Sequence, residues 1–232
     1  MLRKFKIILA VGASFFVAAC GGGGGSDATG PQTSTDTFQI KTAITNYVVN
    51  TQTRNATMSG TVNGVTVSGS AIVTEGALSS AFFEGKSAFS KATTVTGSIL
   101  VNGTQVPLGT TSIDFFDSNY LPIGSLGSDY SVVRGVTNLP LTAKVGDTAI
   151  LYVADTYTNS TKAFVTGTET VSYVMEPDTS STALLSLIST YKDTAGSTTS
   201  TDTVNLRITP SGALTWLSET SVGSGRNLKA AY

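Results

Sequence analysis

The feature that most constrains the fold is a repeated alternation of β-branched or aromatic residues with small polar ones. Val204, Leu206 and Ile208, for example, alternate with Asn205 and Arg207. Because strand side chains point to opposite faces in turn, this pattern gives one apolar and one polar face. Threonine is abundant throughout, and 24 glycines supply turns and bulges. The sequence therefore predicts a mainly β fold.

Two Asn-Gly pairs mark hairpin turns within this pattern. Asn63-Gly64 and Asn102-Gly103 each separate two such runs, and both residue types tolerate the positive φ of a two-residue turn. The predicted strands are Met58–Val62, Val65–Val73, Val95–Val101, Thr104–Leu108, Ser112–Phe116, Tyr130–Arg134, Thr148–Ala154, Lys162–Met175, Thr182–Tyr191, Thr203–Thr209 and Ala213–Glu219. Their order predicts an antiparallel meander that forms a curved sheet, a half-barrel or a sandwich.

One segment, at about residues 36–53, favours a helix. Its apolar residues recur at helical spacing: Ile40, Ala43, Ile44, Tyr47 and Val48. Asp36 or Thr37 is a candidate N-cap. Because several of these residues are β-branched, a strand is the alternative.

Two patterns bear on how the strands are arranged. The run from Ala149 to Val153 is apolar throughout, which predicts a strand that is covered on both faces. The motif Val95-Thr96-Gly97-Ser98 recurs as Val165-Thr166-Gly167-Thr168. The second pattern raises the alternative of two weakly related halves, at about 54–140 and 141–232.

Residues 1–19 have the form of a signal peptide. Basic residues at positions 3, 4 and 6 precede an apolar run at 7–17, which is shorter than the roughly 20 residues that cross a bilayer as a helix. The segment Val17-Ala18-Ala19-Cys20 resembles the lipobox of bacterial lipoproteins. This resemblance implies cleavage before Cys20 and attachment of a diacylglycerol to its thiol.

Cys20 is the only cysteine of the chain, so an exported form can make no internal disulfide. In the lipoprotein family an aspartate after the cysteine favours the inner membrane. Gly21 stands there, so the outer membrane is expected. Residues 20–37 are rich in glycine and serine and predict a flexible tether of about 20–25 Å. The β-rich domain then occupies residues 38–232.

Composition argues against several functions. The chain has no histidine, the commonest general base and metal ligand, so we expect neither an enzyme nor a metal or other cofactor. A net charge of −1 without clustered Lys and Arg is a poor match for nucleic acid. Ser189 and Lys192 match a Ser-x-x-Lys pattern, but they lie on a predicted strand and no Lys-Thr-Gly motif accompanies them. We interpret that match as chance.

Several carboxylates are candidate site residues. Asp114 and Asp117 flank two phenylalanines and could offer oxygen ligands to Ca²⁺, although a turn stabilised by an Asp side chain is the preferred interpretation. Glu84, Glu169 and Glu176 are candidate acids, with a surface position preferred.

Aromatic residues could line a binding cleft, although a place in the core is preferred. They are Phe82, Phe83, Phe115, Phe116, Tyr120 and Trp216. If they fill a solid core, an interaction domain is favoured, whereas a large apolar pocket favours a carrier.

In general form the chain resembles uncharacterised bacterial envelope lipoproteins. Two functional hypotheses follow. The first is a lipid-anchored, non-enzymatic interaction or structural domain that contacts envelope proteins or glycans. The alternative is a carrier of a lipid or other apolar ligand, held in a concave sheet with the helix at 36–53 across its mouth.

Overall fold

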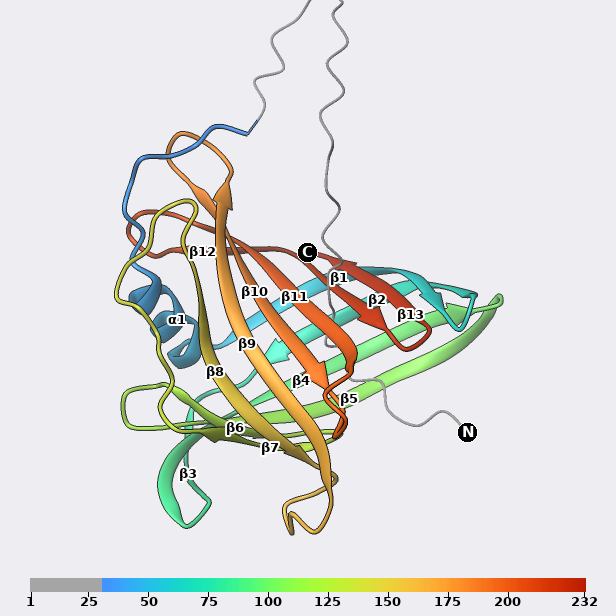
Figure 1. Cartoon of the computed structure of the whole chain (residues 1–232). Coiled ribbons are helices and arrows are strands. Elements are labelled where there is room, and N and C mark those ends of the chain that lie inside the picture. The colour runs from blue at the N-terminus through green and yellow to red at the C-terminus, as the bar shows by residue number, and fades with distance from the viewer. Residues whose placement is uncertain (1–30) are drawn as a thin grey trace, which may run out of the picture.

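The computed structural model describes residues 31–232, in which thirteen strands join in one antiparallel sheet (Figure 1). The elements in chain order are α1 (Ile40–Val49), β1 (Gln52–Val62), β2 (Val65–Glu75), β3 (Ser79–Phe83), β4 (Lys86–Val101), β5 (Thr104–Phe116), β6 (Pro122–Leu126), β7 (Tyr130–Arg134), β8 (Thr148–Tyr157), β9 (Val165–Pro177), β10 (Ala183–Lys192), β11 (Thr198–Ile208), β12 (Leu214–Gly223) and β13 (Arg226–Ala231). The predicted signal peptide, Cys20 and most of the predicted tether lie outside the described residues.

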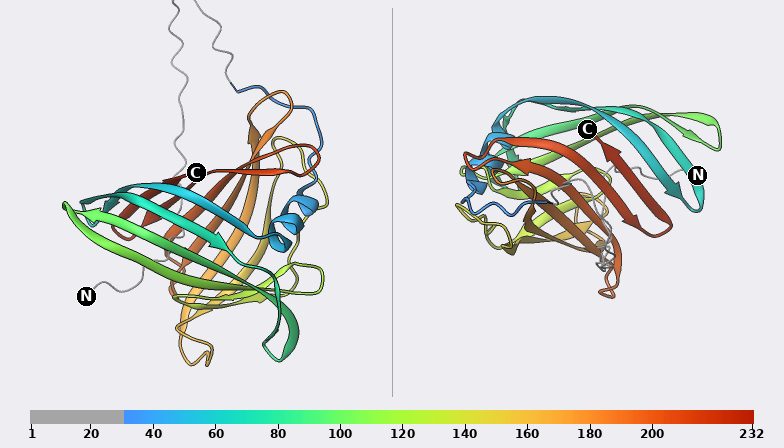
Figure 2. Two further views of the ribbon diagram at one scale, coloured as in Figure 1. Left: turned by 180° about the vertical axis from the view of Figure 1, so that it is seen from behind. Right: turned by 90° about the horizontal axis from the view of Figure 1, so that it is seen from above.

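The sheet closes on itself. Strand β1 pairs with β13, and β2 pairs with β4 as well as with β1, so twelve strands form a closed barrel. Strand β3 stays outside the ring and pairs only with β4 among the described strands. The two views of Figure 2 show the strands curving round a common axis. The predicted antiparallel meander is confirmed, and its curvature continues to full closure.

The strand predictions succeed where alternation is strong. Both Asn-Gly turns are present, with φ of 51° at Asn63 and 50° at Asn102. The two runs predicted between residues 104 and 116 are one strand, β5. Three strands were missed, β3, β6 and β13, because they are short and rich in Ser, Pro, Gly or charged residues.

The predicted helix is confirmed as α1, although it is shorter than 36–53. Its N-cap is Gln39, which makes no capping hydrogen bond, so the predicted cap by Asp36 or Thr37 is wrong. Among residues 31–232, no helix has the length and apolar character that a membrane span requires.

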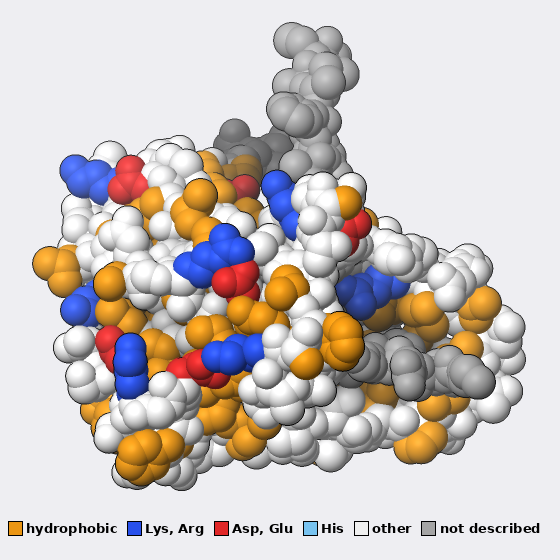
Figure 3. Space-filling model, turned by 60° about the horizontal axis from the view of Figure 1, so that its bottom comes forward, with side chains coloured by type: hydrophobic (Ala, Val, Ile, Leu, Met, Phe, Trp, Pro, Cys, Tyr) orange, Lys and Arg blue, Asp and Glu red, His pale blue; other side chains and the backbone are white. Residues whose placement is uncertain are grey.

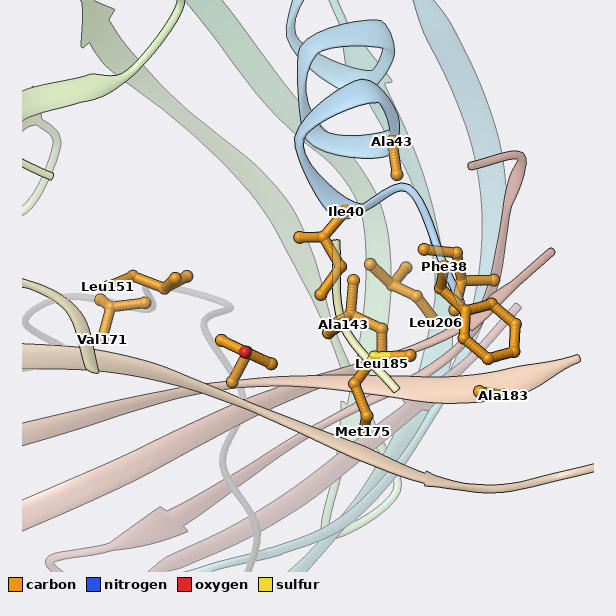
Figure 4. Packing of buried hydrophobic residues seen from close by; sticks show 12 residues of the cluster. Phe38, Ile40, Ala43, Ala143, Leu151, Val171, Met175, Ala183, Leu185 and Leu206 are labelled. Carbon is orange, nitrogen blue, oxygen red and sulfur yellow. The ribbon is translucent and has the colours of Figure 1, made fainter. Parts of the chain in front are cut away.

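Helix α1 lies at one end of the barrel and packs on side chains that point into it. Figure 4 shows Phe38 and Ile40 beside Leu185 and Leu206, which come from the inner faces of β10 and β11. These four side chains are at most 2% exposed. A second apolar cluster fills the barrel between β1, β2, β4, β5 and β13. Exposed threonines and serines, such as Thr57 of β1, occupy many outward positions.

Close strand packing at the second cluster depends on glycine. Gly97 of β4 has a φ of 153°, and a Cβ there would lie 2.2 Å from the backbone oxygen of Ser70. Glycine is the residue that accepts both the positive φ and this close approach of the neighbouring strand.

Strand β3 covers part of the outer face of the barrel. Phe83 stacks on Phe115 at 4.4 Å between ring centroids and contacts Tyr130 at 5.5 Å. Its ring lies against Gly124, where a Cβ would come within 2.3 Å. At the β3–β4 turn, Glu84 accepts a hydrogen bond from the Tyr130 hydroxyl and pairs with Lys162 of the β8–β9 loop.

The prediction that the run from Ala149 to Val153 is covered on both faces is wrong. Ile150 points outward and is 57% exposed. The register of β8 against β9 shifts between Ile150 and Tyr152, which is a β-bulge at Leu151. As a result Leu151 and Tyr152 both point into the barrel, and the alternation of the strand is broken there.

Candidate functional site in the barrel lumen

A cavity of about 240 Å³ lies inside the barrel, between α1 and strands β5 to β10. Most of its wall is apolar, and Val48, Phe116, Leu151, Val171 and Leu187 contribute to it. An engineered protein cavity of about 150 Å³ holds benzene, so this one has room for a ligand on the order of ten heavy atoms.

One side of the cavity is polar and acidic. Asp114 of β5 and Glu169 of β9 line it together with Tyr152 and Tyr191. The Tyr191 hydroxyl donates a hydrogen bond of 2.9 Å to Glu169. Burial, reinforced by the nearby carboxylates, raises the pKa of both tyrosines well above the usual range. Both phenols therefore stay protonated at neutral pH.

A second, more polar pocket of about 240 Å³ adjoins this cavity. The two share Ser131, Glu169 and Tyr191 as lining residues. The second pocket is also lined by Ser128 of the β6–β7 turn and by Arg226 at the start of β13, both at the end of the barrel opposite α1. The shared residues therefore connect the cavity beneath α1 with the opposite end of the barrel.

A buried ionic network holds α1 against the barrel wall. Glu75 of β2 is 1% exposed and contacts Arg54, the Lys91 ammonium at 3.0 Å and the Tyr47 hydroxyl at 2.9 Å. Lys91 also donates hydrogen bonds to the backbone oxygens of Tyr47 at 2.5 Å and Asn50 at 2.8 Å. Backbone carbonyls at a helix C-terminus have no hydrogen-bond donor within the helix. Here Lys91 of β4 is the donor for two of them.

Aromatic rings extend this network along the lumen. The Arg54 guanidinium lies 3.8 Å from the ring centroid of Trp216, a cation–π contact. Tyr232 packs edge-on against Trp216 and donates a hydrogen bond to Glu219. Burial raises the pKa of Glu219 to about 7, although the hydrogen bond from Tyr232 and the charge of Arg54 act in the opposite direction.

The two aspartates predicted as alternative Ca²⁺ ligands have different roles. Asp117 accepts hydrogen bonds from the backbone N–H groups of Asn119 and Leu121, at 2.8 and 2.9 Å, so the preferred turn interpretation is confirmed. Asp114 points into the lumen instead. No group of three or more potential metal ligands occurs within residues 31–232.

The three candidate glutamates occupy three different places. Glu84 lies on the outside at the β3–β4 turn, and Glu176 is exposed on β9, where it accepts a hydrogen bond from Ser186. Both therefore have the expected surface position. Glu169 does not, because it faces the lumen and lines the cavity.

The Ser-x-x-Lys residues lie on β10, as predicted. Because they are three positions apart, Ser189 and Lys192 point to opposite faces of the strand. Strand geometry thus separates the hydroxyl from the amine that the pattern would pair.

The aromatic candidates do not form one cleft. Phe82 is 80% exposed, Phe83 and Phe115 stack outside the barrel, and Trp216 packs within the ionic network. Tyr120 stacks on Phe89 in the turn after β5. Phe116 alone among the six candidates lines the cavity.

Sequence reasoning missed Arg54, Glu75, Lys91 and Tyr152 as residues of the lumen. The positions of the first three could have been predicted from the sequence. Each lies an even number of residues from the buried apolar residues of its strand, so its side chain is expected on the same, inner face. Tyr152 had none, since the bulge at Leu151 reverses the alternation there.

Comparison of this chain with protein-family models, curated proteins and solved structures found no match, so the lumen itself is the basis for a functional assignment.

Proposed function

We propose that this protein is a lipid-anchored, non-enzymatic envelope protein whose barrel binds a small ligand in its lumen. The observation that carries the proposal is the cavity of about 240 Å³ beneath α1, enclosed by apolar side chains on most sides and by a few polar groups on one. Concave, mostly apolar sites with a few convergent polar groups are typical of small-molecule binding.

The size of the cavity limits the ligand. It exceeds a cavity that holds benzene by about 90 Å³, which is far too little for the chains of a phospholipid. The cavity therefore supports the carrier hypothesis only for a small, partly apolar ligand. The helix lies across one end of the barrel, as the carrier hypothesis expects.

Ligand binding in the lumen has a direct test. Residues 31–232, purified without the anchor, should carry a molecule that native mass spectrometry detects and solvent extraction releases. Leu187→Trp should abolish its retention, because the larger side chain fills the cavity. Leu184→Trp, on the outer face of the same strand, should retain the ligand. Retention by Leu187→Trp at the wild-type level would place the ligand elsewhere.

One observation favours the interaction-domain hypothesis as a second candidate. Phe82 and Phe164 are 80% and 72% exposed, and the contact between Glu84 and Lys162 joins the β3–β4 hairpin, which carries Phe82, to the β8–β9 loop, which carries Phe164. The hairpin and the loop both project at the bottom of Figure 1. On the face turned forward in Figure 3, exposed hydrophobic side chains lie among adjacent acidic and basic ones. Such a surface suits a protein or glycan partner in the envelope.

The anchor is part of the same proposal. The lipobox at Cys20 and Gly21 support attachment to the outer membrane through a lipid. Gln32 forms a β-bridge with Asp178 at the β9–β10 turn, so the chain enters the barrel at the α1 end. The point of attachment is then at the end of the barrel away from the β3–β4 hairpin and the β8–β9 loop, which carry Phe82 and Phe164.

Cys20→Ser should release the protein from membranes, because a serine hydroxyl cannot form the thioether to diacylglycerol. The measurement is fractionation of cells that express the full chain, with a carbonate wash and metabolic labelling by a fatty acid. Ser26→Ala, in the same tether, should leave both anchoring and label intact. A Cys20→Ser protein that stays with washed membranes would contradict the anchor.

A further inference from the structure

We propose that the second pocket, at the end of the barrel opposite α1, is a separate binding site for one neutral sugar unit. This site goes beyond the proposed function, because it takes a different class of ligand from the cavity beneath α1. The observation that supports it is a pocket wall made of polar side chains, with one buried hydrogen-bond donor that has no partner.

The wall of this pocket is polar throughout. Of its twelve described lining residues, seven carry a hydroxyl group and the other five carry a charge. The adjoining cavity beneath α1 has a similar volume but a mostly apolar wall. At about 240 Å³ the second pocket exceeds a cavity that holds benzene, so it has room for one sugar ring. A ligand with many hydroxyl groups can replace its hydrogen bonds to water by bonds to such a wall.

The charged groups of the wall are of both signs. Lys192 and Arg226 line the same pocket as Asp129, Glu169 and Asp202. A ligand with a net charge would therefore meet a like charge on the wall, whichever sign it had. This composition favours a ligand without net charge.

The three carboxylates of the wall also interact with the protein itself. Ser128 donates a hydrogen bond of 3.1 Å to Asp129, and Tyr191 donates one of 2.9 Å to Glu169. Asp202 likewise has a partner. A neutral sugar needs no uncompensated carboxylate, because each of its hydroxyl groups both donates and accepts hydrogen bonds. An amino acid, whose ammonium group requires such a carboxylate, is disfavoured.

Arg226 supplies a hydrogen-bond donor for a ligand oxygen. Its Nε is buried and has no hydrogen-bond partner among residues 31–232. Asp202 lies 3.9 Å from another nitrogen of the same guanidinium, which is too far for a hydrogen bond. Because an unpaired buried N–H costs free energy, a ligand hydroxyl that accepts its hydrogen bond is stabilised. Ser200, which is 8% exposed, adds a hydroxyl group to the same pocket.

The pocket is accessible from the end of the barrel that lies away from the proposed anchor. Lys192 and Thr199 line the pocket and are exposed, so it opens to solvent beside them. The chain enters the barrel at the opposite end, where Gln32 bridges Asp178. A sugar can therefore reach the pocket without passing α1.

Methyl glycosides are suitable probes, because they are neutral and present one sugar ring. At least one of the methyl pyranosides of glucose, galactose and mannose should bind residues 31–232 with a Kd on the order of 1 mM or lower. The measurement is NMR titration, in which amides of the β6–β7 and β12–β13 turns should shift. Cyclohexanol, serine and methyl glucuronide should each bind at least about tenfold more weakly, because they lack the hydroxyl groups or the neutrality of the glycosides.

Two conservative variants locate the site. Arg226→Lys keeps the charge but removes the Nε donor, so it should weaken glycoside binding about tenfold. Ser200→Ala removes one hydroxyl group and should weaken binding about threefold. Arg207→Lys makes the same exchange as the first variant on the outer face of β11, outside the pocket, and should leave the affinity unchanged. Thermal melting of each variant confirms that it is folded.

A disaccharide distinguishes the two sources of a sugar unit. Equal affinity for the methyl disaccharide that ends in the preferred sugar would identify the terminal unit of a glycan. Exclusion of this disaccharide would identify a free monosaccharide, and either result supports the site.

Failure of this site and failure of the proposed function give different results. Leu187→Trp fills the cavity beneath α1 but does not line the second pocket, so it should leave glycoside affinity unchanged. If none of the three methyl glycosides binds, or if serine or methyl glucuronide binds as tightly as the best of them, the sugar assignment is wrong. Equal glycoside affinity in Arg226→Lys and wild type would also overturn it. None of these results alters the retention of a ligand beneath α1, which tests the proposed function.

Discussion

Lys91→Met is expected to lower the free energy of unfolding by about 3 kcal/mol and to loosen α1 from the barrel. The side chain of Lys91 is 3% exposed, and its ammonium contacts Glu75 and the backbone oxygens of Tyr47 and Asn50. Methionine preserves the length of the side chain but leaves both helix carbonyls without this donor. Breaking a buried ion pair typically costs about 3–5 kcal/mol. Since Arg54 still neutralises Glu75, we expect the lower end of that range.

Two measurements separate the local effect from the global one. Urea unfolding should show the loss of stability, and hydrogen exchange should show faster exchange of the α1 amides than of those in β10. Lys86→Met changes an exposed lysine of the same strand and should alter stability by no more than about 0.5 kcal/mol. Wild-type protection of α1 in Lys91→Met would show that this lysine does not hold the helix.

In the same ionic network, the inward direction of a charged side chain could be predicted from the sequence, whereas its partners could not. In β4, Lys91 begins a series of alternate positions that continues with Thr93, Val95, Gly97 and Ile99, all on the inner face. A charged residue in phase with core positions indicates a polar lumen, and this signal is present in the amino-acid sequence itself. Which charges then meet depends on the register between strands far apart in the chain, and no local pattern specifies it.

Closure of the sheet into a barrel likewise could not be predicted from local sequence patterns. Hairpins follow from Asn-Gly pairs, because the turn and its two strands are adjacent in sequence. The β1–β13 pairing joins the two ends of the barrel sequence, and its last strand, Arg226–Ala231, has weak β propensity of its own. Tertiary pairing overrides that propensity. The alternatives of curved sheet, half-barrel and sandwich could therefore not be resolved by periodicity.

The cavity could not be predicted from the sequence for a different reason. Its acidic wall brings Asp114 and Glu169 together from β5 and β9, which are joined through the intervening strands β6 to β8. The bulge at Leu151 then turns Tyr152 toward them. A bulge depends on the pairing of two strands, so the uninterrupted apolar run around Leu151 gave the opposite expectation, a strand covered on both faces.

The pH dependence of stability should depend strongly on one carboxyl group, that of Glu219. It lies on the inner face of β12, accepts a hydrogen bond from Tyr232 and faces Arg54 and Glu75. Burial raises its pKa from 4.5 to about 7, which means that the folded protein holds a proton that the unfolded chain releases. A raised carboxyl pKa makes folding less favourable as pH rises. The window lies between 4.5 and about 7.

Glu219→Gln should remove this dependence, because the amide keeps an acceptor for Tyr232 and has no charge to desolvate. At about 1.36 kcal/mol per pH unit, the wild type loses about 3 kcal/mol between about pH 4.5 and about pH 8 through Glu219. Relative to the wild type, the variant should therefore gain about 3 kcal/mol over that interval. The shifted pKa of Glu219 already includes its attraction to Arg54. The expected change in relative stability between variant and wild type therefore needs no further correction for this ion pair.

Urea unfolding of both proteins at several pH values across this interval measures the change. Glu176→Gln, at an exposed position on the outer face of β9, controls for the removal of a carboxyl group without burial. A constant difference between Glu219→Gln and wild type across the series would show that Glu219 is ionised in the folded barrel throughout. In that case Arg54 would outweigh burial, and the lumen beside Trp216 would be wetter than the packing of its rings indicates.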